Sequence, residues 1–252
     1  MIRSNELQSY LNNLLAVERF KDYAPNGLQV QGASTIKVIC TAVTASQSAI
    51  EAAMKHSAEA LLVHHGYFWR GETPVISGMR RERIAALLAH NMNLFAYHLP
   101  LDCHLELGNN ARIGQLLELK DVTAHSVDAI PDLLWTGFLT QPHNADSLTA
   151  LLTDKFQRAP LYISGTERPI QFIAWCSGSA QDYIEQAHAL GADAYLSGEI
   201  SERTFYQARE LGLHYFSCGH HATERYGIQA LGEHLSQQFG LKHYFIDSDN
   251  PV

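Results

Sequence analysis

The chain has 252 residues, 46% of them hydrophobic, and a formal net charge of −8, so one or two folded domains are expected and a disordered protein is excluded. The acidic balance disfavours an extended nucleic-acid surface, because phosphate groups repel negative charge. No apolar run reaches the roughly 18 residues that a membrane span needs, so we expect no membrane partner.

The first half of the chain predicts alternating helices and strands. Leucines at helical spacing predict a helix over residues 5–20, and Pro25-Asn26-Gly27 marks a turn. The elements expected after this turn are a strand at 36–43, a helix at 46–56, a strand at 60–63, a helix at 80–90 and a strand at 94–97. This order predicts an α/β sheet with parallel connections.

The same order of elements returns in the second half. The expected elements are a strand at 170–175, a helix at 181–190, a strand at 194–197, a helix at 201–211 and a strand at 214–218. Residues 36–65, shifted by 134 positions, align with 170–199 without a gap, and nine of the thirty pairs are identical. A self-match at a fixed offset indicates an internal duplication.

The end of the repeat carries a shared chemical motif. At an offset of 122, Tyr97-His98-Leu99-Pro100-Leu101-Asp102 aligns with Gly219-His220-His221-Ala222-Thr223-Glu224, so both copies have His-x-x-x-acid after the last strand. The copies differ at His64-His65, where the second has Gly198-Glu199. We therefore predict two pseudo-symmetric α/β lobes, covering 1–125 and 126–252, with a metal site between them.

Residues 120–168 lie between the two copies of the repeat. They contain Pro131, Pro142 and Pro160, and a helix is expected around 147–156 as part of the second lobe.

Histidines and carboxylates gather where the predicted strands end, the edge of an open α/β sheet at which ligands bind. His64 and His65 follow one strand, and His98 with Asp102 and His220 with Glu224 follow two others. Burying these groups together is costly unless a cation pairs with them. Imidazole and carboxylate ligands suit zinc, iron, manganese or nickel. The pattern therefore predicts a site for divalent metal ions.

The spacing of these residues suggests two ions. Neighbouring strand residues point to opposite sides, so His64 and His65 can reach different ions. His220 and Glu224 share a face if a helix begins there. Asp102 and Glu224 are the candidates for carboxylates that bridge two ions about 3.5–4 Å apart, which would activate water and hold an anionic substrate.

Several residues near this predicted site keep two interpretations. His98 is either a ligand, like its repeat partner His220, or an acid/base group. Glu199 either faces the site or packs structurally. Tyr67-Phe68-Trp69 either stacks on a bound ring or belongs to the core or to a subunit contact. For Gly108-Asn109-Asn110 the first interpretation is a turn and a helix cap.

The four cysteines are widely spaced and form no CxxC pair. Free thiols in a reducing compartment fit this pattern better than a disulfide framework, and Cys40 and Cys176 fall in strand-like runs as small core residues. The stretch Met1–Leu7 has no hydrophobic signal core. We therefore expect a cytoplasmic protein.

These motifs together resemble the NIF-three-like family, also called GTP cyclohydrolase I type 2 homologues. The resemblance rests on His64-His65-Gly66, on the segments 98–102 and 108–110, on 219–224, and on the segment Asp22–Val30. The resemblance runs from about residue 5 to the end of the chain. Within the family, the sequence resembles the short bacterial form. The resemblance implies two α/β lobes around a dinuclear metal site, with His64, His65, Asp102, His220 and Glu224 as ligands, and ring-shaped homohexamers.

The function expected from the sequence is that of a metal-dependent hydrolase acting on a nucleotide or related heterocycle, with two divalent ions per chain (zinc, iron or manganese). His98 is the predicted catalytic residue, as a proton shuttle. The alternative is a non-catalytic metal-binding scaffold or regulatory interaction protein. The family name alone does not decide the substrate.

Overall fold

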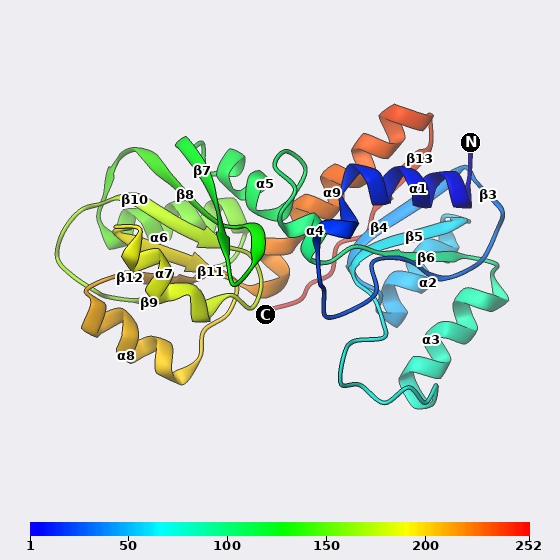
Figure 1. The fold of residues 1–252 in the computed structure, drawn as a ribbon, viewed down its shortest axis with the longest axis horizontal. Coiled ribbons are helices and arrows are strands. Elements are labelled where there is room, and N and C mark those ends of the chain that lie inside the picture. Colours follow the sequence, from blue (N-terminus) through cyan, green and yellow to red (C-terminus); the bar gives the residue numbers. More distant parts are fainter. The chain divides into compact units, whose positions relative to one another are not determined.

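The computed structural model describes residues 1–252, which divide into two units (Figure 1). Unit 1 comprises Met1–Leu101 and Gly227–Asp249, and unit 2 comprises Asp102–Tyr226 and Asn250–Val252. The predicted ranges were 1–125 and 126–252, whereas residues 102–125 belong to unit 2 and residues 227–249 belong to unit 1.

Unit 1 is built on a five-stranded sheet in the order β13-β4-β5-β6-β2. Its strands are β2 (Gly27–Val30), β4 (Val38–Thr44), β5 (Ala60–His65), β6 (Asn93–Ala96) and β13 (Lys242–Phe245), with a separate antiparallel pair of β1 (Ile2–Arg3) and β3 (Thr35–Ile36). Its helical elements are α1 (Ser4–Leu14), η1 (Val17–Arg19), α2 (Gln47–Lys55), α3 (Gly78–Ala89) and the larger part of α4 (Leu99–Asp102). The helices predicted over 46–56 and 80–90 are confirmed. The helix predicted over 5–20 ends earlier, at Leu14, because Ala16 has a positive φ of 46°, and a short 3-10 turn follows it.

Unit 2 is built on a six-stranded sheet in the order β7-β8-β10-β11-β12-β9. Its strands are β7 (Lys120–Val127), β8 (Ile130–His143), β9 (Leu161–Ile163), β10 (Ile170–Cys176), β11 (Ala194–Ser197) and β12 (His214–Ser217). Its helical elements are α5 (Asn109–Leu116), α6 (Ala145–Phe156), η2 (Gln181–Tyr183), α7 (Ile184–Ala189) and α8 (Glu202–Leu211). The long helix α9 (His220–Phe239) begins in unit 2 and ends in unit 1.

The strand register confirms the internal repeat. Ile39 pairs with Ala60 between parallel β4 and β5, and Ile173 pairs with Ala194 between β10 and β11, which is the same register at an offset of 134. A carboxylate repeats as well: Glu59 accepts the backbone N–H groups of residues 37 and 38. Asp193, 134 positions later, accepts those of residues 171 and 172. The two copies therefore share pairing and local hydrogen bonding.

The expected parallel connections are confirmed for the predicted strands, β4-β5-β6 and β10-β11-β12, and the edge strand β13 is also parallel to β4. The other strands that were not predicted pair differently. In unit 1, β2 runs antiparallel to β6. In unit 2, β8 runs antiparallel to β10 and β9 to β12. β7 and β8 form a hairpin in the segment where only a helix was expected, and its turn residues Asp128 and Ala129 both have positive φ. Antiparallel strands thus lie at both edges of the unit 2 sheet.

Each unit has a hydrophobic core of its own. In unit 1, α2 and α3 pack on β4, β5 and β6, with Ile50 and Leu87 fully buried. In unit 2, α5 and α6 pack on the sheet face that carries Ile173 and Trp175. All four cysteines are buried free thiols, in agreement with the expectation of thiols, and Cys40 and Cys176 are core residues as predicted. The structure contains no helix with the length and apolar character of a bilayer span.

Candidate metal centre

Three imidazoles meet at one edge of the unit 1 sheet. His64 and His65 end β5, and His98 lies two residues beyond the neighbouring strand β6. One ring nitrogen of each lies within 4.8 Å of the others. The rings of His64 and His65 have centroids only 4.6 Å apart, so the two side chains lie together rather than pointing to opposite sides. Parallel neighbours end at the same sheet edge, which explains how residues 33 positions apart converge.

His64 has its tautomer set by the backbone. The side chain is fully buried, and Nδ1 lies 3.0 Å from the carbonyl oxygen of Tyr97. A carbonyl can only accept, so Nδ1 carries the hydrogen, and in the neutral ring the lone pair is on Nε2. A ligating histidine typically has this arrangement, in which the second nitrogen donates to a carbonyl.

His98 is oriented by a buried carboxylate, Asp22, for which the sequence alone indicated no role. Its Nδ1 lies 2.7 Å from Oδ1 of Asp22, whose side chain is only 3% exposed. The backbone N–H of His98 also donates to Asn26 Oδ1 at 2.7 Å. The only signal for these contacts was the segment Asp22–Gly27, which the family resemblance included.

Asp22 is held from several directions. Its carboxylate accepts hydrogen bonds from the backbone N–H groups of Tyr23 and Leu99 and from the side chain of Asn26. Burial raises the pKa of Asp22, but the hydrogen bond and charge of His98 and the other donors lower it further, so the net pKa is lowered. Asp22 is therefore a carboxylate anion that fixes the His98 ring.

The aromatic segment after His65 divides between the two interpretations. Tyr67 is a core residue, and its hydroxyl donates to the carbonyl of Ala45 at 2.8 Å. Trp69 is half-buried and lies edge-on to His98, with ring centroids 4.9 Å apart. Tyr67 thus follows the structural interpretation, whereas Trp69 forms a wall beside the histidines.

Unit 2 carries the second set of candidate ligands, which are Asp102, His220 and Glu224. His220 is the first residue of α9 and Glu224 lies one turn later, as predicted for two residues on one helix face. His220 Nε2 lies 3.1 Å from Glu224 Oε2. Carboxylate oxygens of Asp102 and Glu224 lie within 4.8 Å of each other, although only 5% and 2% of the two residues are exposed. Two buried carboxylates at this separation repel unless a cation lies near them.

Asp102 is held by side chains that the sequence did not reveal as part of the site. Its Oδ1 accepts from Asn109 Nδ2 at 2.8 Å and from Ser177 Oγ at 2.9 Å. Asn110, also buried, accepts from the backbone N–H of Ser177 at 2.8 Å. The sequence predicted only a turn and helix cap at 108–110. It did not predict that these residues hold Asp102 together with Ser177, because Ser177 is distant in sequence.

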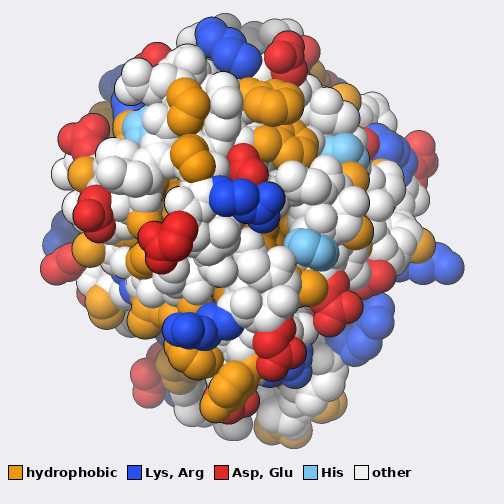
Figure 2. Space-filling model, turned by 90° about the vertical axis from the view of Figure 1, so that its left-hand side faces the viewer, with side chains coloured by type: hydrophobic (Ala, Val, Ile, Leu, Met, Phe, Trp, Pro, Cys, Tyr) orange, Lys and Arg blue, Asp and Glu red, His pale blue; other side chains and the backbone are white.

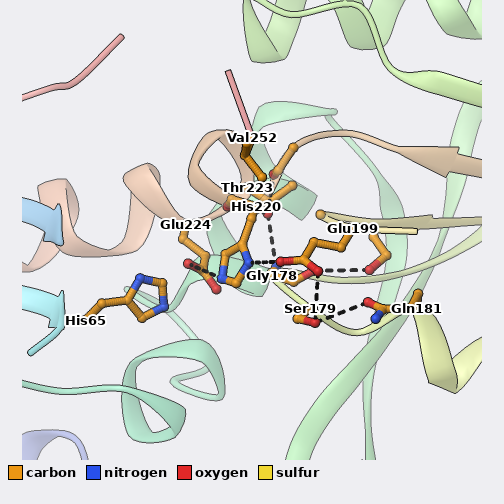
Figure 3. A network of polar contacts seen from close by, with 12 residues as sticks. His65, Gly178, Ser179, Gln181, Glu199, His220, Thr223, Glu224 and Val252 are labelled. Atoms are coloured by element: carbon orange, nitrogen blue, oxygen red, sulfur yellow. Dashed lines mark hydrogen bonds and ion pairs between the residues drawn. The ribbon is translucent and has the colours of Figure 1, made fainter. Parts of the chain in front are cut away.

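Glu199 faces the site, which was one of its two interpretations. Its Oε1 lies 2.6 Å from His220 Nδ1, and its Oε2 accepts from Ser179 Oγ at 3.3 Å (Figure 3). His220 therefore lies between Glu199 and Glu224. Burial lowers the pKa of His220, but the two carboxylates raise it further, to about 9.

We expect the chelated protein to lose stability as pH rises through about 9. The folded pKa of His220 lies above the ordinary 6.5, so its stabilisation is fully present below that value and disappears as the pH passes about 9. The loss is on the order of 3 kcal/mol at about 1.4 kcal/mol per pKa unit. Urea unfolding of chelated protein between neutral and alkaline pH measures it. His220→Gln should reduce the slope, and an unchanged slope would show that other groups cause it.

Two glycines, Gly178 and Gly198, bring the backbone against the His220–Glu224 pair. Figure 3 shows Gly178 beside this pair. A Cβ at Gly178, which has φ +67°, would overlap Glu224 Oε1 and lie 3.3 Å from His220 Nε2. A Cβ at Gly198 would lie 2.8 Å from the Cα of His220. The position of Gly178 after β10 therefore requires the absence of a side chain.

The donor atoms of both units fit divalent metal ions. Unit 1 offers imidazole nitrogens with one tautomer set for ligation, and unit 2 offers one imidazole with two buried carboxylates. Oxygen and imidazole donors suit zinc, iron and manganese, and no thiolate is among them. The structure thus defines a duplicated α/β protein with candidate metal ligands at the strand ends.

The chain belongs to the family described as Duf34/NIF3 (NGG1p interacting factor 3), whose model matches residues 2–251. A protein of Allochromatium vinosum named GTP cyclohydrolase 1 type 2 homolog is 49% identical over 247 residues, which cover 98% of this chain and 96% of that protein. A protein of Yersinia pestis with the same name is 48% identical over the whole of both chains. A solved structure described as protein ybgI, of unknown function, is 45% identical with a TM-score of 0.93, and covers 100% of both chains.

Proposed function

We propose that the two sets of candidate ligands together hold two divalent metal ions per chain, of zinc, iron or manganese. The proposed ligands are His64, His65, Asp102, His220 and Glu224. The observation that carries the proposal is the pair of buried carboxylates, Asp102 and Glu224, within 4.8 Å of each other. Buried carboxylates grouped with an imidazole are a donor set that suits a divalent cation, and a carboxylate can serve two ions at once.

We further propose that the protein is a hydrolase acting on a nucleotide or a related heterocycle. A pair of divalent ions lowers the pKa of water and stabilises negative charge on a substrate. The relatives named GTP cyclohydrolase 1 type 2 homolog support a nucleotide substrate.

His98 is the proposed acid/base residue. Asp22 fixes Nδ1 at 2.7 Å, so proton exchange with a substrate takes place at Nε2. The Asp22 anion stabilises the imidazolium that forms when Nε2 takes a proton. Trp69 shields one side of the ring from water.

Arg158 supports an anionic substrate. Its Nη1 is buried and makes no hydrogen bond within the protein. The side chain lies against Gly219, next to His220, and its charge lowers the pKa of the neighbouring thiol Cys218 against the larger raising effect of burial. A guanidinium beside His220 is suited to a phosphate group of a substrate.

Variants of His98 and Arg158 test the proposed hydrolase. Metal-loaded wild type, His98→Ala and Arg158→Gln are assayed against nucleotides, pterins and phosphoesters, with metal content measured alongside. We expect His98→Ala to keep its metal and to lose about 10²–10⁴-fold in kcat. Arg158→Gln should mainly raise KM for phosphate-bearing substrates. Joint loss of metal and turnover in His98→Ala would make His98 a ligand instead.

A non-catalytic role as a metal-binding scaffold or regulatory partner is the second candidate. The family description, an interacting factor, favours it. A fully loaded wild type without turnover across the panel, and with a protein that co-purifies at fixed stoichiometry, would support this role and overturn the hydrolase.

The remaining proposals concern assembly and compartment. The resemblance implies homohexameric rings, and we propose that the protein forms them. The other proposed partner is a small-molecule substrate. The four free thiols support the cytoplasm as the compartment.

A further inference from the structure

A carboxylate lies behind the His220 ring in unit 2. Glu199 Oε1 is 2.6 Å from His220 Nδ1, whereas the opposite ring nitrogen, Nε2, is 3.1 Å from Glu224. Figure 3 shows the three side chains in a row, with the His220 ring in the middle. Glu199 belongs to none of the three groups of donor atoms that could hold an ion. The contact of Glu199 with the candidate metal centre therefore runs through His220.

Glu199 is held in place by the loops around it. Its backbone N–H donates to the carbonyl of Gly178 at 3.2 Å, and its carbonyl accepts the hydroxyl of the fully buried Tyr215 at 2.6 Å. Ser179 Oγ donates to the carboxylate oxygen Oε2 at 3.3 Å. The side chains of His220 and Glu199 are only 25% and 36% exposed. The pair therefore has a defined geometry, unlike an ion pair between two mobile surface side chains.

The internal repeat does not account for this contact. His220 corresponds to His98 at the offset of 122, and His98 also has a carboxylate on Nδ1, that of Asp22 at 2.7 Å. Glu199, however, corresponds to His65 at the offset of 134, and Asp22 precedes the repeated segments. Each unit thus places a carboxylate on the same atom of the repeat-related histidine, but takes it from a different part of the chain. The same contact from two unrelated positions indicates a role at the site rather than packing shared through the repeat.

A carboxylate on Nδ1 acts on the other nitrogen of the ring. It accepts the Nδ1 hydrogen, which leaves the lone pair of the neutral ring on Nε2 and fixes the orientation of the ring. Its negative charge also makes Nε2 a stronger donor to a cation. Carboxylates behind metal-bound histidines typically contribute about 10–100-fold to metal affinity.

We propose that Glu199 is a positioning residue, which directs Nε2 of His220 toward a divalent ion and raises the affinity for that ion. The proposal rests on the proposed metal-binding function, with His220 as a ligand. Glu199 has the same relation to His220 as Asp22 has to His98. Ser179 supports the arrangement, because it holds the second carboxylate oxygen of Glu199.

Two substitutions separate the hydrogen bond of Glu199 from its charge. Glu199→Gln keeps an oxygen that accepts the Nδ1 hydrogen but removes the charge, and Glu199→Leu removes both. Competition with a zinc-binding dye measures the zinc affinity of the full-length protein. We expect a zinc dissociation constant to rise about tenfold in Glu199→Gln and about 100-fold in Glu199→Leu. Ser179→Ala, which removes one donor to Glu199, should have a smaller effect than Glu199→Gln.

NMR spectra of the imidazole nitrogens in zinc-loaded protein report the position of the ring. In wild type the Nδ1 hydrogen of His220 should be shifted downfield and should exchange slowly with water, because Glu199 accepts it. Its absence in His220→Gln assigns the signal. The signal should move upfield in Glu199→Gln and disappear through exchange in Glu199→Leu. A general loss of stability would not produce this graded change, so the spectra separate positioning from a structural role.

Glu210 supplies the matched control, because it is an exposed carboxylate on α8 of the same unit. The face of unit 2 drawn in Figure 2 carries acidic and basic side chains intermixed. Removal of one exposed charge from such a surface changes the field at a distant site little, since solvent and salt screen it. Glu210→Gln and Glu210→Leu should therefore bind zinc like wild type and show the wild-type His220 signal.

Three results would overturn the proposal. One is a zinc affinity of Glu199→Leu equal to that of wild type. Another is an unchanged His220 signal in Glu199→Leu. The third is a loss of zinc in Glu199→Gln as complete as that expected for Asp102→Asn, which would make Glu199 a ligand.

The wild-type measurement distinguishes these results from a failure of the proposed function. A wild type that binds no zinc, manganese or iron would overturn the proposed metal site and this proposal with it. Normal metal binding by wild type, beside Glu199 variants that behave like the Glu210 variants, would overturn this proposal alone.

Discussion

Asp102→Asn should lose most of both metal ions while the protein stays folded. The substitution keeps the size of the side chain and retains an oxygen for Asn109 and Ser177, which donate to Oδ1 at 2.8 and 2.9 Å. It removes the negative charge that we propose is shared by two cations. Loss of such a ligand should weaken metal binding beyond the roughly 10–100-fold that outer contacts contribute.

Elemental analysis after metal reloading and gel filtration measures the metal content. Urea unfolding of chelated samples measures the stability of the fold. Wild type should approach two ions per chain. Glu210→Gln, an exposed carboxylate on α8, is the control and should match wild type. An Asp102→Asn protein that holds two ions with unchanged affinity would remove Asp102 from the ligand set. Unfolding of chelated Asp102→Asn at much lower urea would indicate a structural role instead.

The repeated part of the fold was predictable because its signals are local. Apolar runs bounded by turns predicted β5 and β11, and identities at a fixed offset predicted that both copies would pair alike, which the shared register confirms. The same reasoning located His64, His65 and His220 at strand ends. The i, i+4 relation of His220 and Glu224 needed only the start of a helix.

The β7–β8 hairpin was missed for a physical reason. Its two-residue turn places Asp128 and Ala129 at φ 51° and 63°, a conformation for which the sequence signal is asparagine or glycine. Alanine gives no such signal. The flanking strands therefore appeared only as a connection between the copies.

Contacts that hold the candidate ligands were missed because they join residues distant in sequence. Asp22 contacts His98 across 76 positions, and Ser177 contacts Asp102 across 75. Single-sequence patterns report periods of two to four residues, so they identify the ends of strands but not which loops meet there. The resemblance to a family pointed to the segment that contains Asp22, but gave it no role.

Gly178→Ala should be the most damaging small substitution at the unit 2 ligands. The new methyl group would overlap Glu224 Oε1, so either the carboxylate or the loop must move. Gly178 is also held in place: its N–H donates to Thr223 Oγ1 at 3.0 Å, and its carbonyl accepts from Gly198 at 2.9 Å. The displaced group should therefore be Glu224, and metal content should fall with it.

Gly212→Ala separates this overlap from backbone strain. Gly212 has φ +64°, close to the +67° of Gly178, but a Cβ there would meet nothing within 4 Å. Each variant pays about 1–2 kcal/mol for alanine in a left-handed conformation. Overpacking should lower the free energy of unfolding of Gly178→Ala by a further ~1–3 kcal/mol. Urea unfolding and elemental analysis of both variants should show Gly212→Ala fully metal-loaded and Gly178→Ala depleted. Equal metal content in the two would mean that Glu224 can move without losing the ion, and would argue against it as a bridging ligand.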